Sequence, residues 1–180
     1  MIRFFSVISL VVMTLSAGCG YSARALLPAR FRVVYVEPFT NRMHLTQLST
    51  ELRTFQTTVP RLQEDVTNEV INRFIFDGYL QVTAKKENAD LVLVGEIIDF
   101  HRQELRQDES GNVEEYRLNL IANLVMHDAT KGEVLWEEPS FIGDTTYFLS
   151  GSSSISEADA MENLITNFAQ RAVERTIEDW

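Results

Sequence analysis

The sequence predicts an α/β (α+β) domain built as a two-layer sandwich, in which a mixed, largely antiparallel sheet of four to five strands carries two helices on one face. Two patterns predict this class. Apolar residues alternate with polar ones along one long segment, and they recur every three to four positions along two others. The segments follow in the order strand, helix, several strands, helix. Of the 180 residues, 45% are hydrophobic and 23% are charged, which suits one packed core.

The N-terminal residues 1–18 have the composition of a signal peptide. Arg3 supplies a positive charge, and residues 4–17 form an almost unbroken apolar run. A helix of that length is about 21 Å long, shorter than the roughly 30 Å hydrocarbon layer of a membrane. A cleaved signal therefore fits better than a membrane-spanning helix. We expect residues 19–30 to form a tether and residues 31–180 to form a single domain.

The only cysteine of the chain, Cys19, follows the sequence Leu-Ser-Ala-Gly. This junction resembles a bacterial lipobox, although Ser16 stands where Leu is usual. The resemblance implies cleavage before Cys19, a diacylglyceryl group on its sulfur and an acyl chain such as palmitate on the new N-terminus. Gly20 rather than Asp follows, which by the same resemblance favours the outer membrane. The alternatives are a free cysteine or an ordinary secretory signal that ends nearby.

A first strand is predicted over residues 31–37, which are rich in β-branched and aromatic side chains. Pro38 ends this strand because proline has no N–H to donate to a neighbouring strand. Residues 40–58 turn to Thr, Gln, Ser and Asn and are predicted to form a loop, with a helical turn between residues 45 and 55.

A helix is predicted over residues 60–76. Pro60 suits the first turn of a helix, and Gly78 suits its end because glycine readily adopts positive φ. The apolar face of this helix contains Leu62, Val66, Val70, Ile71, Phe74 and Ile75.

A run of strands follows. Residues 79–84 predict a short strand, and residues 89–98 predict a central strand that extends beyond Phe100, because its first half is apolar on both faces. A turn at residues 108–112 precedes the clearest alternation in the chain. There Tyr116, Leu118, Leu120, Ala122, Leu124 and Met126 share one face, and Glu115, Arg117, Asn119, Asn123 and His127 share the other.

The last strand and the last helix complete the domain. A turn at residues 128–132 leads to a strand over residues 134–137, which is expected to resume near Ser140 after Pro139. A helix begins near Ser156, with a capping box completed by the carboxylate three residues later. Its apolar face contains Ala158, Met161, Leu164, Ile165, Phe168, Ala172, Val173 and Ile177. The large aromatic side chains Phe74, Phe100 and Phe168 are expected in the core.

Several short motifs, taken in their order and spacing, resemble the LptE family of lipopolysaccharide-assembly lipoproteins. They are Cys19-Gly20-Tyr21, residues 33–41, the helix that ends at Gly78, residues 89–95 and Glu115-Tyr116-Arg117. The resemblance implies an outer-membrane lipoprotein that sits inside the lumen of the β-barrel protein LptD, helps it to assemble, and helps it to pass lipopolysaccharide to the outer leaflet. Binding of lipopolysaccharide by the lipoprotein itself is also implied. Residues 40–58 are longer than the family pattern and are either a partner contact or a solvated insertion.

Charge is distributed unevenly along the chain. Residues 19–63 carry six arginines and two carboxylates, whereas residues 64–180 carry 9 basic and 24 acidic side chains. A basic segment next to the anchor favours anionic lipid headgroups there, and the acidic body opposes binding to nucleic acid. Scattered, solvated arginines are the alternative interpretation.

Three arginines flank the turn at residues 108–112, namely Arg102, Arg106 and Arg117. Guanidinium groups bind phosphate through paired hydrogen bonds, so these residues are candidates for contact with the phosphates of lipopolysaccharide. Neutralisation by neighbouring carboxylates is the competing interpretation. Those carboxylates are Glu104, Asp108, Glu109, Glu114 and Glu115.

No catalytic site is predicted. The three histidines, His44, His101 and His127, are far apart in sequence and show no metal-ligand spacing, and a phosphate-binding glycine loop with its lysine is absent. A single cysteine excludes an intramolecular disulfide and a thiolate-rich metal site within one chain. No metal or cofactor is therefore expected.

The alternation after the turn at residues 108–112 predicts a polar sheet face with Glu115, Asn119 and Asn123, and the family resemblance implies that this face of a non-enzymatic subunit contacts the interior of a barrel. Two alternatives come from other classes. One is a periplasmic lipoprotein accessory to a lipid ABC transporter or to peptidoglycan synthesis. The other is a lipid carrier, which would need an enclosed apolar cavity.

Overall fold

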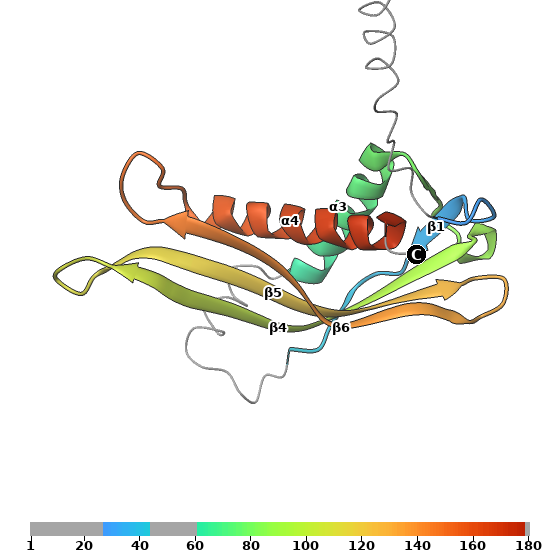
Figure 1. Cartoon of the computed structure of the whole chain (residues 1–180), viewed down its shortest axis with the longest axis horizontal. Helices are drawn as coiled ribbons and strands as arrows, with labels where there is room; N and C mark the ends of the chain where they lie inside the picture. Colours follow the sequence, from blue (N-terminus) through green and yellow to red (C-terminus); the bar gives the residue numbers. More distant parts are fainter. Residues whose placement is uncertain (1–26, 44–60, 179–180) are drawn as a thin grey trace, which may run out of the picture.

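A computed structural model describes residues 27–43 and 61–178. The described strands are β1 (Val33–Val36), β2 (Thr40–Asn41), β3 (Gln81–Val82), β4 (Leu91–Gln107), β5 (Val113–Asp128) and β6 (Val134–Phe148), and the described helices are α3 (Leu62–Asp77), the short 3-10 helix η2 (Lys86–Asn88) and α4 (Glu157–Glu178). Both α-helices lie on one side of the sheet (Figure 1), which confirms the predicted two-layer α+β class.

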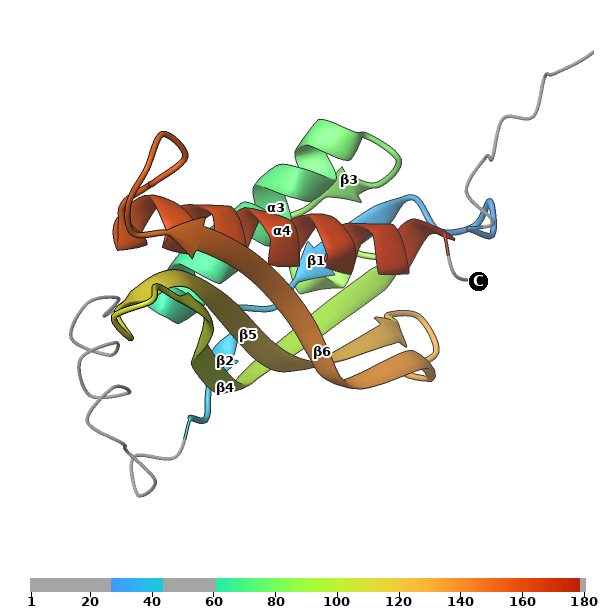
Figure 2. The same cartoon turned by 60° about the vertical axis from the view of Figure 1, so that its left-hand side comes forward.

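The sheet is mixed and open. Its strand order is β3-β1-β4-β5-β6, and β2 pairs with β4 outside this order. β1 pairs in parallel with β3 and β4, whereas β4, β5 and β6 pair antiparallel through two hairpins. The three long strands twist strongly beneath α4 (Figure 2), so they set the shape of the domain. Including β2, the sheet has six strands, slightly more than predicted.

Most predicted elements are confirmed, with shifted ends. The first strand and the strand expected at residues 79–84 are shorter than predicted, because β1 and β3 pair over only two positions. The interruption expected at Pro139 is present in the pairing but not in the strand, because Pro139 and Ser140 have no register partner on β5 and pairing resumes at Phe141. β6 runs through this proline, and its register against β5 shifts between Ala122 and Leu124. Ser140 adopts a φ of 57° and donates its N–H to Asn123 Oδ1 at 3.1 Å. Such an irregularity accommodates a proline without a lost ladder bond.

The two helices end and begin where the sequence predicts. Gly78 has a φ of 74° and donates its N–H to Phe74 O, which closes the last turn of α3. At the start of α4, Ser156 Oγ accepts the N–H of Asp159 at 3.1 Å, and the Asp159 carboxylate accepts the N–H of Ser156 at 3.3 Å. This reciprocal pair is the capping box. The helical turn predicted between residues 45 and 55 lies outside the described residues.

Two glycines bring backbone and aromatic rings into close contact in the core. A Cβ atom added to Gly143 of β6 would lie 2.8 Å from Phe168 Cα of α4, so α4 packs directly on the strand there. A Cβ added to Gly95 of β4 would overlap the ring of Phe39. Phe168 in turn meets Phe39 and Phe141 edge to face, with ring centroids 6.0 and 5.3 Å apart. The helices and the sheet are thus joined around Phe168.

Thr67 ties α3 to the segment that follows β1. Its buried hydroxyl accepts the N–H of Phe39 at 2.9 Å and donates to Gln63 O at 2.6 Å. We expect Thr67→Val to lower the free energy of unfolding by about 1–3 kcal/mol, because the Phe39 N–H would lose its acceptor inside the core. Urea denaturation measures this loss. Thr166→Val, at an exposed position of α4, serves as the control, and an equal loss in both variants would contradict the assignment.

Candidate functional site

The sheet face away from the helices carries a broad set of polar side chains. Alternation along β5 places Glu115, Asn119 and Asn123 on this face, and all three are partly buried. The even-numbered residues of β5 from Leu118 to Met126 point to the other face and are buried under the helices, as predicted. We call the helix-free side of β4, β5 and β6 the open face.

The centre of the open face is mixed in character. Asn119 lies between His101 of β4 and Asp144 of β6. The next position, Ile121, pairs with Ile142, which is 40% exposed. Apolar side chains therefore interrupt the polar ones in the middle of this surface. Mixed surfaces of this kind are typical of interfaces that retain water at the rim.

Two of the three predicted phosphate-binding arginines meet at one end of the open face. Arg106 lies opposite Glu115, with Nη2 3.7 Å from Oε2, and its guanidinium lies 5.6 Å from the centre of the Phe148 ring. Arg117 is on the same face of β5 as Glu115, and its buried Nε has no hydrogen-bond acceptor among the described residues. Arg106 thus has a carboxylate neighbour, while Arg117 retains donor capacity.

The third arginine, Arg102, lies on the helix-bearing face, because it pairs with the buried Leu118. Its Nη1 is 3.5 Å from Glu157 Oε2 at the start of α4, and its guanidinium lies 4.9 Å from the centre of the Tyr116 ring. Tyr116 stacks on Tyr147. Burial and the nearby Glu157 raise the pKa of Tyr147, and Arg102 partly offsets this rise. Arg102 is therefore engaged in a separate cluster.

The separation of the arginines has a structural cause. Simple alternation would place Arg102 and Arg106 on the same face of a strand. A register shift between Glu104 and Arg106 instead inserts one residue, Leu105, and moves Arg106 to the open face. No motif in the sequence marks this bulge. The structure thus brings Arg106 and Arg117 together and leaves Arg102 apart.

The turn between β4 and β5 is organised by Asp108. Its Oδ1 accepts the N–H groups of Ser110 and Asn112 at 2.8 Å each, and its Oδ2 accepts Asn112 Nδ2 at 2.9 Å. These bonds, led by the Asn112 side chain, lower the pKa of the Asp108 carboxyl below its ordinary value. The hairpin tip that carries the candidate arginines is therefore pre-shaped by one carboxylate.

The lowered pKa predicts how the turn responds to acid. The stabilisation is complete above the ordinary pKa of aspartate, about 3.9, and is lost as the pH falls through the lower pKa of the folded turn. We expect amide exchange at Ser110 and Asn112, corrected for intrinsic rates, to accelerate in that acidic range. Asp108→Ala should exchange fast at every pH. NMR exchange that is independent of pH in the parent chain would contradict this role.

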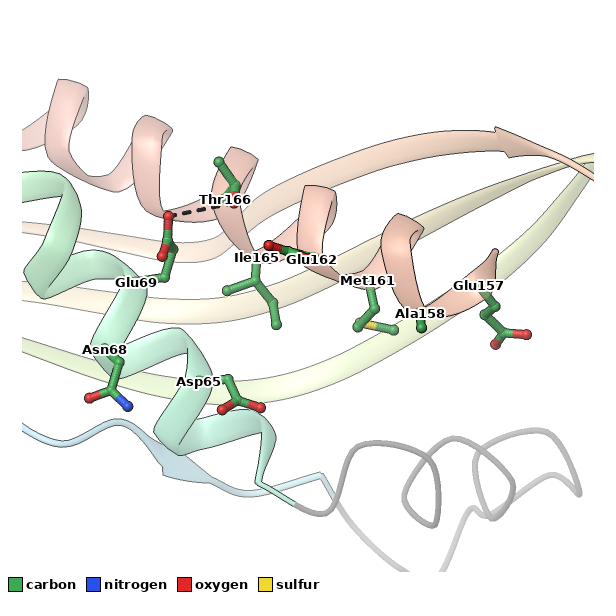
Figure 3. A pocket seen from close by; sticks show the side chains of 9 residues that line it. All are labelled: Asp65, Asn68, Glu69, Glu157, Ala158, Met161, Glu162, Ile165 and Thr166. Carbon is green, nitrogen blue, oxygen red and sulfur yellow. Dashed lines mark hydrogen bonds between the residues drawn. The ribbon is translucent and has the colours of Figure 1, made fainter. Parts of the chain in front are cut away.

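A groove of about 460 Å³ lies between α3 and α4 (Figure 3). Its charged lining is entirely acidic, and its apolar lining comes mainly from α4. The acidic residues are Asp65, Glu69, Glu157 and Glu162, and the apolar ones are Ala158, Met161 and Ile165. A groove with four carboxylates repels phosphate, so its chemistry differs from that of the arginine pair. The sequence predicted both helices but not this groove, because it depends on how they pack.

Other predicted features have the following positions. Cys19 and His44 lie outside the described residues. His101 Nε2 is 3.0 Å from Asp99 Oδ2 at the surface, and His127 lies on β5. No cluster of three potential metal ligands occurs within residues 27–43 and 61–178. Within the same residues, no helix is both long and apolar enough to cross a membrane.

Comparison with known proteins adds a family and a fold. A family model described as LptE, lipopolysaccharide-assembly, matches residues 31–179. Among solved structures, a variant of dodecameric PelC from Paraburkholderia phytofirmans has a TM-score of 0.51 at 14% identity, covering 85% of this chain and 94% of its own. The protein CT253 from Chlamydia trachomatis has a TM-score of 0.52 at 18% identity, covering 81% of this chain and 95% of its own. At these identities both likenesses show the fold alone. Among curated proteins, none matches the sequence.

Proposed function

Because the chain belongs to the LptE family of lipopolysaccharide-assembly proteins, we propose that it is a lipoprotein subunit of the outer-membrane machinery that assembles lipopolysaccharide. In this proposal a lipid on Cys19 holds the chain at the outer membrane. The folded domain occupies the lumen of an LptD-like barrel, on the periplasmic side, and supports its assembly. Its action is steric and conformational, and it involves no catalysis.

The observation that carries the proposal is the open face. β4, β5 and β6 are 17, 16 and 15 residues long, and both described α-helices cover the same side of them. The other side keeps partly buried polar residues such as Asn119 and the exposed Ile142. A long sheet surface with polar and apolar positions interspersed suits contact with the polar inner wall of a barrel.

Contact with lipopolysaccharide is proposed for Arg106 and Arg117. They lie at the same end of the open face, and guanidinium groups bind phosphate oxygens through paired hydrogen bonds. Arg102 is the least favourable of the three predicted residues for phosphate binding, because it lies on the other side of the sheet beside the carboxylate of Glu157. The acidic groove between the helices is not proposed as a site for this ligand.

Deletion of the gene tests the proposal. We expect less correctly assembled barrel in the outer membrane and less lipopolysaccharide at the cell surface, and we expect the intact chain supplied in trans to restore both. Western blots of the folded barrel and surface labelling of lipopolysaccharide measure the two quantities. Normal levels of both in the deletion strain would contradict the proposal. If a Cys19→Ala chain fails to restore the folded barrel and the surface lipopolysaccharide, the lipid on Cys19 is required for both.

A further inference from the structure

Three large apolar side chains near the C-terminal end of α3 are exposed. Ile75 and Phe76 lie in its last turn and are 62% and 80% exposed, and Tyr79 follows the helix end and is 57% exposed. The assignment of Ile75 to the apolar face of the helix is therefore wrong, because the buried face of α3 runs from Leu62 to Phe74 and the last turn extends past the sheet edge residues it packs on; Phe76 and Tyr79 also lie outside this face. We call Ile75, Phe76 and Tyr79 the α3-end patch. Three large apolar side chains exposed within five residues at one helix end favour a binding partner there.

The α3-end patch lies at the edge of the sheet where the described chain begins. β3 follows Tyr79 directly and pairs in parallel with β1, so that Gln81 lies opposite Val33. The Gln81 N–H donates to Arg32 O at 2.8 Å. Parallel pairing places the residues before β3 beside the residues before β1. The C-terminal end of α3 and the described residues that precede β1 therefore share one end of the domain.

The length of the N-terminal segment limits how far the patch can be from a membrane. Seven residues lie between the sulfur-bearing Cys19 and Leu27, the first described residue, so eight Cα–Cα steps join the two. Fully extended, they span at most about 29 Å. A chain anchored by Cys19 must keep this end of the domain within that distance of the bilayer. The opposite end, with the turn at Asp108, has no such restriction.

We propose that the α3-end patch is a second membrane contact, which rests in the interfacial layer of the leaflet that holds the lipid of Cys19. This inference rests on the lipid anchor of the proposed function. Aromatic side chains favour the boundary between headgroups and acyl chains, and Tyr79 can keep its hydroxyl among the headgroups. Arg73, whose guanidinium lies 5.3 Å from the centre of the Phe76 ring, places a positive charge near the lipid phosphates.

The contact would orient the domain relative to the membrane. A lipid on Cys19 is a single point of attachment, which restricts the distance from the membrane but does not by itself fix the orientation of the domain. A patch that inserts beside the tether fixes two points, so α3 points its C-terminal end at the bilayer. The open face, on the other side of the sheet from α3, then remains available to the barrel.

The test uses a tryptophan placed in the patch. A chain that begins at Cys19 retains the whole described core, and its only thiol couples to a maleimide lipid in phosphatidylcholine vesicles. Phe76→Trp then reports contact with brominated lipids, which quench tryptophan fluorescence. Leu149→Trp is the matched control, because Leu149 is 50% exposed and its backbone N–H donates to Glu114 O beside the far hairpin. The signal of the parent chain, which contains Trp136 and Trp180, is subtracted.

We expect the added tryptophan at residue 76 to be quenched at least about twofold more strongly than the one at residue 149. Adding Ile75→Ser to Phe76→Trp should reduce this difference. Equal quenching at the two positions, in chains with the same melting temperature, would overturn the proposal. The tether is supplied chemically and no barrel is present, so this result is independent of acylation in cells and of barrel assembly. Failure of the patch and failure of the proposed function are therefore distinguishable.

Discussion

Replacing Phe168 by alanine is expected to lower the free energy of unfolding by about 3–5 kcal/mol. Phe168 is fully buried in α4, and its ring contacts those of Phe39 and Phe141 edge to face. The lost ring would leave a cavity that the neighbours cannot fill. Gly143 presents only backbone to it, and the Phe39 ring is already held against Gly95. Denaturation in urea, followed by circular dichroism, measures the effect.

Phe76→Ala is the matched control for this prediction. It removes the same side chain from the same kind of element, but Phe76 is 80% exposed. Its expected effect on the free energy of unfolding in solution is within about 0.5 kcal/mol. Similar losses in the two variants would mean that the contact among Gly143, Phe168 and Phe39 does not join the helices to the sheet as described.

Replacing Ile142 by arginine is expected to reduce the amount of barrel that co-purifies with the chain at least tenfold. Ile142 lies on the open face opposite Ile121 and is 40% exposed, so the substitution adds a charge without disturbing the core. A charge buried at the centre of an interface without a partner costs about 2 kcal/mol or more, and each 1.4 kcal/mol is a factor of ten. Affinity purification from membranes, quantified against the parent chain, measures the ratio.

Ile155→Arg is the control for the interface. Ile155 is 36% exposed and lies in the loop before α4, off the open face. The two substitutions are chemically identical, so charge and solubility change equally. Retention of the barrel by Ile155→Arg but not by Ile142→Arg would support the open face as the contact. Equal retention by both would contradict it.

The sequence predicted the parts of the fold that follow from regular periods. The alternation along β5 placed Leu118 and Asn119 on opposite faces correctly, and the capping box placed the start of α4 at Ser156. Family membership, inferred from short motifs in order, is confirmed by the match over residues 31–179. These features are local or depend on order along the chain, and for this reason they can be read from one sequence.

The features that the sequence did not predict depend on irregular pairing and packing. Bulges in β4 change which of its residues point toward the helices, and one bulge places Arg102 and Arg106 on opposite faces. The continuity of β6 past Pro139 depends on Asn123 of the neighbouring strand, which accepts the Ser140 N–H. The acidic groove requires the relative position of two helices that are distant in sequence. None of these features follows a regular spacing of residues, so no sequence pattern predicts them.

Photocrosslinking in the native membrane tests the central claim most directly. A photoreactive amino acid at Asn119, in the middle of the open face, should capture an LptD-like β-barrel protein, identified by mass spectrometry. The same probe at Gln170, exposed on α4, serves for comparison. Capture of an inner-membrane transporter or of a cell-wall synthase at Asn119, with no barrel, would contradict the account.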